Sequence, residues 1–113
     1  MNTNIDNWSE LQVLDSATMT AALHAQLQPF VEANAQTFVQ DLSHISEAAI
    51  YEGGIQIDAI EHLSDALFRC VYSYDWAIAW TCSGTQEAGR VQEKVRFMID
   101  SDGTAHFKFL KLD

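Results

Sequence analysis

The spacing of apolar residues changes near residue 67, and this change limits the possible folds more than any other feature of the chain. Before it, apolar residues recur in steps of three, four or seven, as on one face of a helix. After it, they alternate with polar residues, as in half-buried strands. Helices followed by strands predict an α+β fold with helices packed on an antiparallel sheet. A length of 113 residues suits a single domain over residues 1–113.

A long helix is expected over about 16–45. Asp15 and Ser16 suit the N-cap, and the apolar stripe begins directly after them. Pro29 lies inside the stripe and lacks a backbone N–H, which indicates a kink or two helices that meet there. Because the stripe continues in phase past the proline, one kinked helix is favoured. Residues 1–14 are expected to form an extended arm or a first helical turn.

A second, short helix is expected over about 58–67. Gly53 and Gly54 tolerate positive φ and end the preceding segment. Asp58 and Glu61 have the spacing of a capping box, and apolar residues follow on one face. Both helices of the predicted fold therefore precede the sheet.

The remaining chain predicts an antiparallel β-meander of three to four strands. Asp102-Gly103 is a strong signal for the last hairpin, because this pair tolerates the backbone that a tight turn requires. A longer loop is expected over 83–90. The alternating runs cover about 68–74, 76–82, 91–99 and 105–109.

Charge is distributed unevenly along the chain. Its 16 acidic and 6 basic side chains give a net charge of −10. Residues 1–68 hold ten acidic side chains and no Lys or Arg, whereas residues 69–113 hold six of each sign. This predicts an acidic helical side and a nearly neutral sheet. Such a surface repels phosphates, which disfavours nucleic acid and anionic membranes, and it attracts basic proteins. A surface that merely keeps the protein soluble is the alternative.

No motif for catalysis or for a cofactor is present. Cys70 and Cys82 lie in apolar stretches, where buried free thiols are common, although Cys82 could also be a nucleophile at a strand end. The four histidines lack the spacing of a zinc protease, and no phosphate-binding glycine loop exists. We therefore expect a protein that is no enzyme and holds no metal. Without a signal peptide or a long apolar run, a reduced cytoplasmic location is expected.

Two groups of residues could form a binding site. Asp58, Glu61, His62 and Asp65 would share one face of the expected short helix, as a solvated surface, a partner contact or a metal site. The segment 72–76 places three aromatic residues around Asp75, as interface anchors or as core.

A run of carboxylates extends through the first half of the chain without an intervening base. Its members are Asp41, Glu47, Glu52, Asp58, Glu61 and Asp65. In this run, its length and its single domain, the chain resembles the small acidic immunity proteins that bacteria pair with secreted toxic nucleases. That resemblance implies a tight inhibitory complex with a basic toxin domain. Small phage-encoded inhibitors, including nucleic-acid mimics, are similar in the same respects.

The leading hypothesis is therefore a protein whose carboxylates replace substrate phosphates in the basic cleft of a toxin. Two alternatives remain. One is a small-molecule domain whose pocket, lined by Trp76, Trp80 and His44 or His62, lies between helices and sheet. The other is a homodimer formed through an exposed sheet face or edge. The expected partner contacts are Glu47, Glu52, Asp58, Glu61, Asp65, Tyr74 and Asp75.

Overall fold

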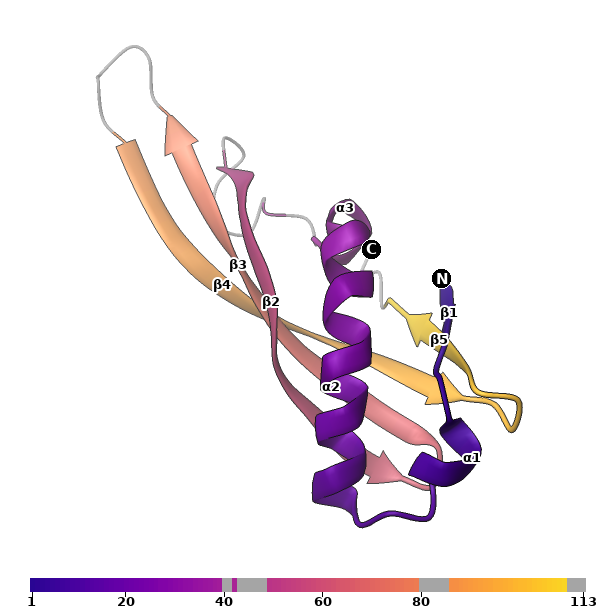
Figure 1. Cartoon of the computed structure of the whole chain (residues 1–113). Helices are drawn as coiled ribbons and strands as arrows, with labels where there is room; N and C mark the ends of the chain where they lie inside the picture. The colour runs from indigo at the N-terminus through magenta and orange to yellow at the C-terminus, as the bar shows by residue number, and fades with distance from the viewer. Residues whose placement is uncertain (40–41, 43–48, 80–85, 110–113) are drawn as a thin grey trace.

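The protein folds into one antiparallel sheet with its helices on one face (Figure 1). The computed structural model describes residues 1–39, 42, 49–79 and 86–109. Along the sheet the strands follow the order β1-β5-β4-β3-β2, so the predicted α+β class is confirmed, with five strands rather than three to four. The elements are β1 (Asn2–Asn4), α1 (Trp8–Leu11), α2 (Ser16–Ala33), α3 (Ala35–Phe38), β2 (Ala49–Ser64), β3 (Leu67–Ala79), β4 (Gln86–Ile99) and β5 (Thr104–Lys108).

The long helix is shorter than predicted. Asp15 caps α2 as expected, since its carboxylate accepts the N–H of Thr18 at 3.1 Å. Pro29 lies inside α2 without ending it, and Asn34, with φ −118° and ψ 28°, separates α2 from α3. The rest of the predicted helix, residues 40–45, lies outside the described residues apart from Leu42. The apolar stripe is confirmed, and its buried members are Met19, Leu23, Leu27 and Val31.

The predicted short helix over 58–67 is wrong, because residues 49–64 form strand β2. The error has a physical cause. Ile57 and Ile60 are both buried against the helices although they lie three residues apart, which an ideal strand does not allow. A register shift between Ile57 and Ala59 inserts an extra residue and restores the orientation. The bulge therefore gives this strand the residue spacing of a helix.

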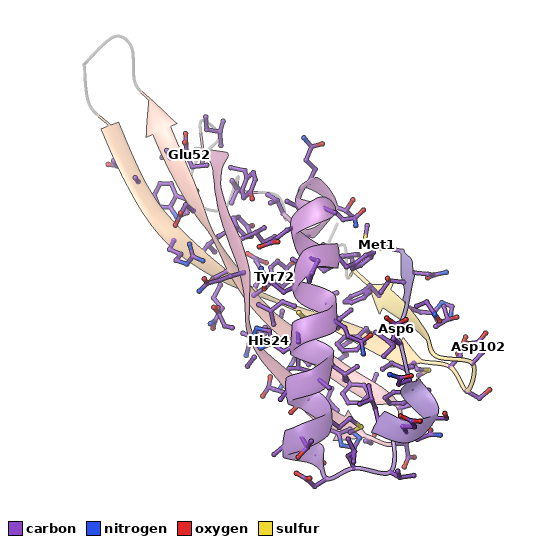
Figure 2. The ribbon with its side chains drawn as sticks, viewed as in Figure 1. Met1, Asp6, His24, Glu52, Tyr72 and Asp102 are labelled. Atoms are coloured by element: carbon purple, nitrogen blue, oxygen red, sulfur yellow. The ribbon has the colours of Figure 1, made fainter. Side chains whose placement is uncertain are left out.

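Aromatic side chains fill the space between the helices and the sheet. Phe68, Phe97 and Phe107 stack across three neighbouring strands, with ring centroids 5.3 and 4.9 Å apart. Phe38 is fully buried and meets Tyr72 edge to face at 5.4 Å. The hydroxyl of Tyr72, which Figure 2 labels, donates to the Phe38 carbonyl at 2.5 Å and so connects β3 to α3. This core fixes which face of the sheet the helices cover.

Helix α2 runs beside the edge strand β2 (Figure 1). The Gln28 side chain replaces a missing strand partner, because its Oε1 accepts the N–H of Ile57 at 2.8 Å and its Nε2 donates to the Ile55 carbonyl at 3.4 Å. Unpaired strand edges otherwise attract other chains. None of the described helices combines the length and the apolar character needed to cross a bilayer.

Replacing Gln28 by Ala should destabilise the protein by about 1 kcal/mol, because two backbone groups of β2 lose their partners. The amide of Ile57 should then exchange its hydrogen faster, which NMR measures directly. Gln36→Ala, at an exposed position of α3, is the matched control and should change neither quantity. Equal effects of the two substitutions would contradict this role of Gln28.

Candidate functional site

Three of the predicted contact residues lie on the face of the sheet turned away from α2, here called the outer face. Asp58, Glu61 and Asp75 point outward, opposite in register to the aromatic side chains of the core. They stand in β2 and β3, not in a helical layer. Of the 23 residues in Ser16–Phe38, Glu32 is the one acidic side chain, so the expectation of an acidic helical side based on these carboxylates is wrong.

Glu61 and Arg69 form an ion pair across β2 and β3. The guanidinium donates to both carboxylate oxygens, at 2.8 and 3.4 Å. This hydrogen bonding holds the pKa of Glu61 below its ordinary value and raises the pKa of Arg69. Glu61 is therefore already neutralised within the molecule.

Asp75 forms an ion pair with Arg90. Arg90 Nη1 donates to Asp75 at 2.7 Å, while Nη2 donates to the Gly54 carbonyl at 2.8 Å. Gly54 has φ +70°, and a Cβ there would lie 2.6 Å from the Asp75 carboxylate. Glycine at this position thus makes room for the ion pair, and it lies within β2 instead of ending a segment.

Asp58 is the centre of a polar network over three strands. Its carboxylate accepts hydrogen bonds from Ser73 at 3.0 Å, Gln92 at 3.0 Å and Gln56 at 3.1 Å. Partial burial raises the pKa of Asp58, but these hydrogen bonds and the charge of Arg90 outweigh it, so the pKa lies below the ordinary value. The structure therefore contradicts an uncompensated acidic patch formed by Asp58, Glu61 and Asp75.

The other predicted contacts are scattered. Tyr74 is fully buried and packs against Tyr51, so it belongs to the core and offers a partner no surface. Glu52 is exposed near the end of β2 that lies far from α1, as Figure 2 shows. Glu47 lies outside the described residues. Asp65 is exposed in the turn between β2 and β3.

The side chains of the metal, thiol and pocket hypotheses lie apart from the outer face or outside the described residues. His62 points inward and stacks on Phe68 at 4.8 Å, away from Glu61. No group of three metal-ligating side chains occurs in the described part of the chain. Burial and the charge of Asp58 raise the pKa of Cys70 to about 12, so this thiol is inert at neutral pH. Trp80, His44 and Cys82 lie outside the described residues.

A surface of which the sequence singled out Asp65 and His62 alone lies where α1, the start of α2 and the β2–β3 turn meet, at the bottom of Figure 1. A pocket of about 310 Å³ opens there. We call this pocket and the exposed residues beside it the basal surface. The pocket is lined by Trp8, Gln12, Leu14, Ser16, Met19, His62, Asp65 and Ala66.

The basal surface combines exposed apolar side chains with carboxylates. Val13 is 79% exposed and Leu14 is 42% exposed, both in the short connection between α1 and α2. Glu10 in α1, Asp15 before α2 and Asp65 in the β2–β3 turn are exposed, and residues 1–68 contain no Lys or Arg. An apolar centre with a charged rim is the usual composition of a protein–protein interface.

Hydrogen bonds hold the floor of this pocket in place. The Asp65 carbonyl accepts from His62 Nε2 at 2.7 Å, and His62 Nδ1 is hydrogen-bonded to the Ser16 hydroxyl at 3.0 Å. Asp65 has φ 39°, a left-handed conformation that few residues other than Gly, Asn and Asp adopt readily. The start of α2 is thus tied to the β2–β3 turn. The adjacent Val13 and Leu14, just before a capped helix, were the available sequence signal.

Comparison with known proteins adds no identification: no family model, no curated protein and no solved structure matches the chain.

Asp58→Asn should lower the free energy of unfolding at pH 7 by about 1 kcal/mol, since Asn accepts fewer hydrogen bonds and the outward position is partly screened by solvent. A carboxyl whose pKa is lowered by folding stabilises the protein above its unfolded pKa, and this contribution disappears as the pH falls through the folded pKa. The difference between wild type and Asp58→Asn should therefore shrink below about pH 3.8.

Urea unfolding at several pH values measures this dependence. Glu52→Gln, an exposed substitution on the same strand, is the control and should show no such change. If the difference in unfolding free energy between wild type and Asp58→Asn stayed constant down to the lowest pH, the charge of Asp58 would play no part in the network.

Proposed function

We propose that this protein is a non-enzymatic inhibitor that captures a basic protein partner through the basal surface, as the immunity proteins that it resembles capture toxins. The observation that carries this proposal is the separation of charge. Each Lys and Arg among the described residues belongs to β3, β4 or β5 and points to the outer face. The carboxylates at the base of α2 consequently have no cation beside them in α1, α2 or the connection between these helices.

The basal surface suits a partner that presents Lys or Arg around an apolar side chain. Glu10, Asp15 and Asp65 would pair with the cations, taking the place of the phosphates that a nuclease cleft normally binds. An apolar side chain of the partner would enter the pocket between Trp8 and Leu14. Buried apolar anchors supply most of the affinity at protein interfaces, and surrounding charges mainly accelerate association.

The proposal keeps one predicted contact and replaces others. Asp65 stays in the contact set because it is exposed and has no basic neighbour in its turn. Recruiting Glu61 or Asp75 would require a partner to break an ion pair and leave Arg69 or Arg90 without its carboxylate. That exchange gains little, because one charge-assisted contact merely replaces another.

Neutralising the basal carboxylates should slow association with the partner. The variant Glu10→Gln/Asp15→Asn/Asp65→Asn preserves the fold, because Asn caps helices as well as Asp and also tolerates left-handed φ. Its association rate should fall roughly tenfold at about 50 mM salt and should approach the wild-type rate at about 500 mM, where charges are screened. The partner is captured from extracts of the native host and identified, and its association is measured by stopped-flow recording of the intrinsic tryptophan fluorescence.

The variant Glu32→Gln/Glu52→Gln/Glu87→Gln is the matched control. It removes the same number of charges at exposed positions away from the basal surface, so its association rate should remain close to that of wild type. If it slows association as much as the basal variant, net charge and not the basal surface governs binding. A captured partner with an acidic contact surface would contradict the proposal altogether.

A further inference from the structure

The outer face of the sheet collects the cations of this acidic protein. Along β4, residues 90, 94 and 96 point outward, while Val95 and Phe97 point into the core. Arg96 stands opposite Arg69 of β3 on one side and opposite Lys108 of β5 on the other. The described cations on this face are Arg69, Arg90, Lys94, Arg96 and Lys108.

Three of these cations have no ion pair among the described residues. Glu61 pairs with Arg69, and Asp75 pairs with Arg90. Asp100, directly after β4, is instead paired with His106 at 2.5 Å. The positive charge of Lys94 contributes to the lowered pKa of Glu61. Within the described part of the chain, the cations without an ion pair are Lys94, Arg96 and Lys108.

This arrangement is unfavourable for the isolated protein. Like charges directly opposite each other on neighbouring strands destabilise a sheet. Arg69, Arg96 and Lys108 nevertheless form a continuous row over three strands, here called the cation row, with Glu61 as the paired carboxylate. A row of like charges that disfavours the folded sheet is the kind of locally unfavourable arrangement that is typical of binding sites. A bound anion would relieve the repulsion.

An apolar hollow adjoins the cation row. It has a volume of about 220 Å³ and is lined by Leu67, Arg96, Phe97, Met98 and Lys108. Met98 is 43% exposed, an unusual position for a large apolar side chain on a charged face. The hollow and the two cations thus offer an apolar contact and a pair of positive charges at one place.

We propose that the cation row and this hollow bind an acidic polypeptide segment of a partner protein. Carboxylates of the segment pair with Arg96 and Lys108, and an apolar side chain between them enters the hollow. The charges favour this occupant over nucleic acid, because the row spans only about 10 Å at ordinary strand spacing and the remaining molecule repels a long polyanion. The hollow favours it over free phosphate, which has no apolar group.

A peptide titration followed by two-dimensional NMR tests the proposal. The probe is N-acetyl-Glu-Glu-Leu-Glu-Glu-amide at low salt, where charge pairs are least screened. It should shift the amides of residues 67–69, 96–98 and 106–108 in a saturable manner. The peptide with Gln in place of each Glu should have no such effect, and the peptide with Gly in place of Leu should bind more weakly.

Two single variants distinguish binding at this site from a general effect of the protein's charge. Arg96→Gln should weaken the acidic peptide about tenfold, the expected effect of losing one charge-assisted pair. Lys94→Gln removes the same charge from the same face outside the hollow and should change the affinity much less. Because Arg96→Gln removes like-charge repulsion, its melting temperature should not fall, which keeps a loss of binding interpretable.

Several outcomes would overturn the proposal. The first is the absence of a saturable amide shift with the acidic peptide. The second is an equal loss of peptide affinity in Arg96→Gln and Lys94→Gln. The third is that inorganic phosphate shifts the same amides by the same amount. If a short oligothymidylate bound at this site more tightly than the peptide, the ligand would be nucleic acid and not an acidic segment. None of these results would bear on the basal surface, so the two proposals fail independently.

Discussion

The pleat of β3 and β4 determines how side chains divide between the two faces of the molecule. Successive residues of a strand point in opposite directions, so one choice of register assigns every side chain of both strands. Stacking of Phe68 on Phe97 fixes that choice, because these rings are buried at 0% and 1% exposure beneath the helices. Arg69 and Arg96 are their neighbours in sequence and are therefore directed outward. The cation row is thus a geometric consequence of the aromatic core.

The sequence predicted elements well where one period persisted without interruption. The stripe of α2, the cap at Asp15 and the alternation within β3 and β4 agree with the structure. The strand bounds were predicted less well, because the expected runs 68–74 and 76–82 belong to the continuous alternation of β3 as far as residue 79, and β4 begins at Gln86, inside the expected loop over 83–90. The prediction failed at β2, where the register shift beside Ala59 converts alternation into helix-like spacing. A bulge is stabilised by pairing with β3 and by contact with Gln28, both distant in sequence. Local pattern alone could not reveal it.

The candidate site was harder to predict than the fold because charge compensation depends on pairing across strands. Glu61 and Arg69 are eight residues apart in the chain, and Asp58 and Gln92 are 34 apart, yet each pair is in contact. Counting charges along the chain treated Glu61 and Asp58 as free. The basal surface uses Asp65, which the sequence did suggest, together with Val13 and Leu14, whose exposure depends on tertiary contacts that the local pattern does not contain.

The two proposed surfaces adjoin at the β2–β3 turn, although their charges are opposite. Asp65 and Ala66 line the basal pocket, and Leu67, the next residue, lines the apolar hollow of the outer face. The turn itself is held at both sides, because Ile99 donates its N–H to the Ala66 carbonyl at 3.0 Å and His62 donates to the carbonyl of Asp65. The net charge of −10 therefore describes the whole chain but not the surface at this turn, where the surface charge changes from negative on the basal side to positive on the outer face.

A partner whose basic cleft is bordered by an acidic segment would meet complementary charge on both sides of the turn, and misaligned docking would place like charges together. Such alternation favours one orientation of the complex more strongly than a uniformly acidic surface can.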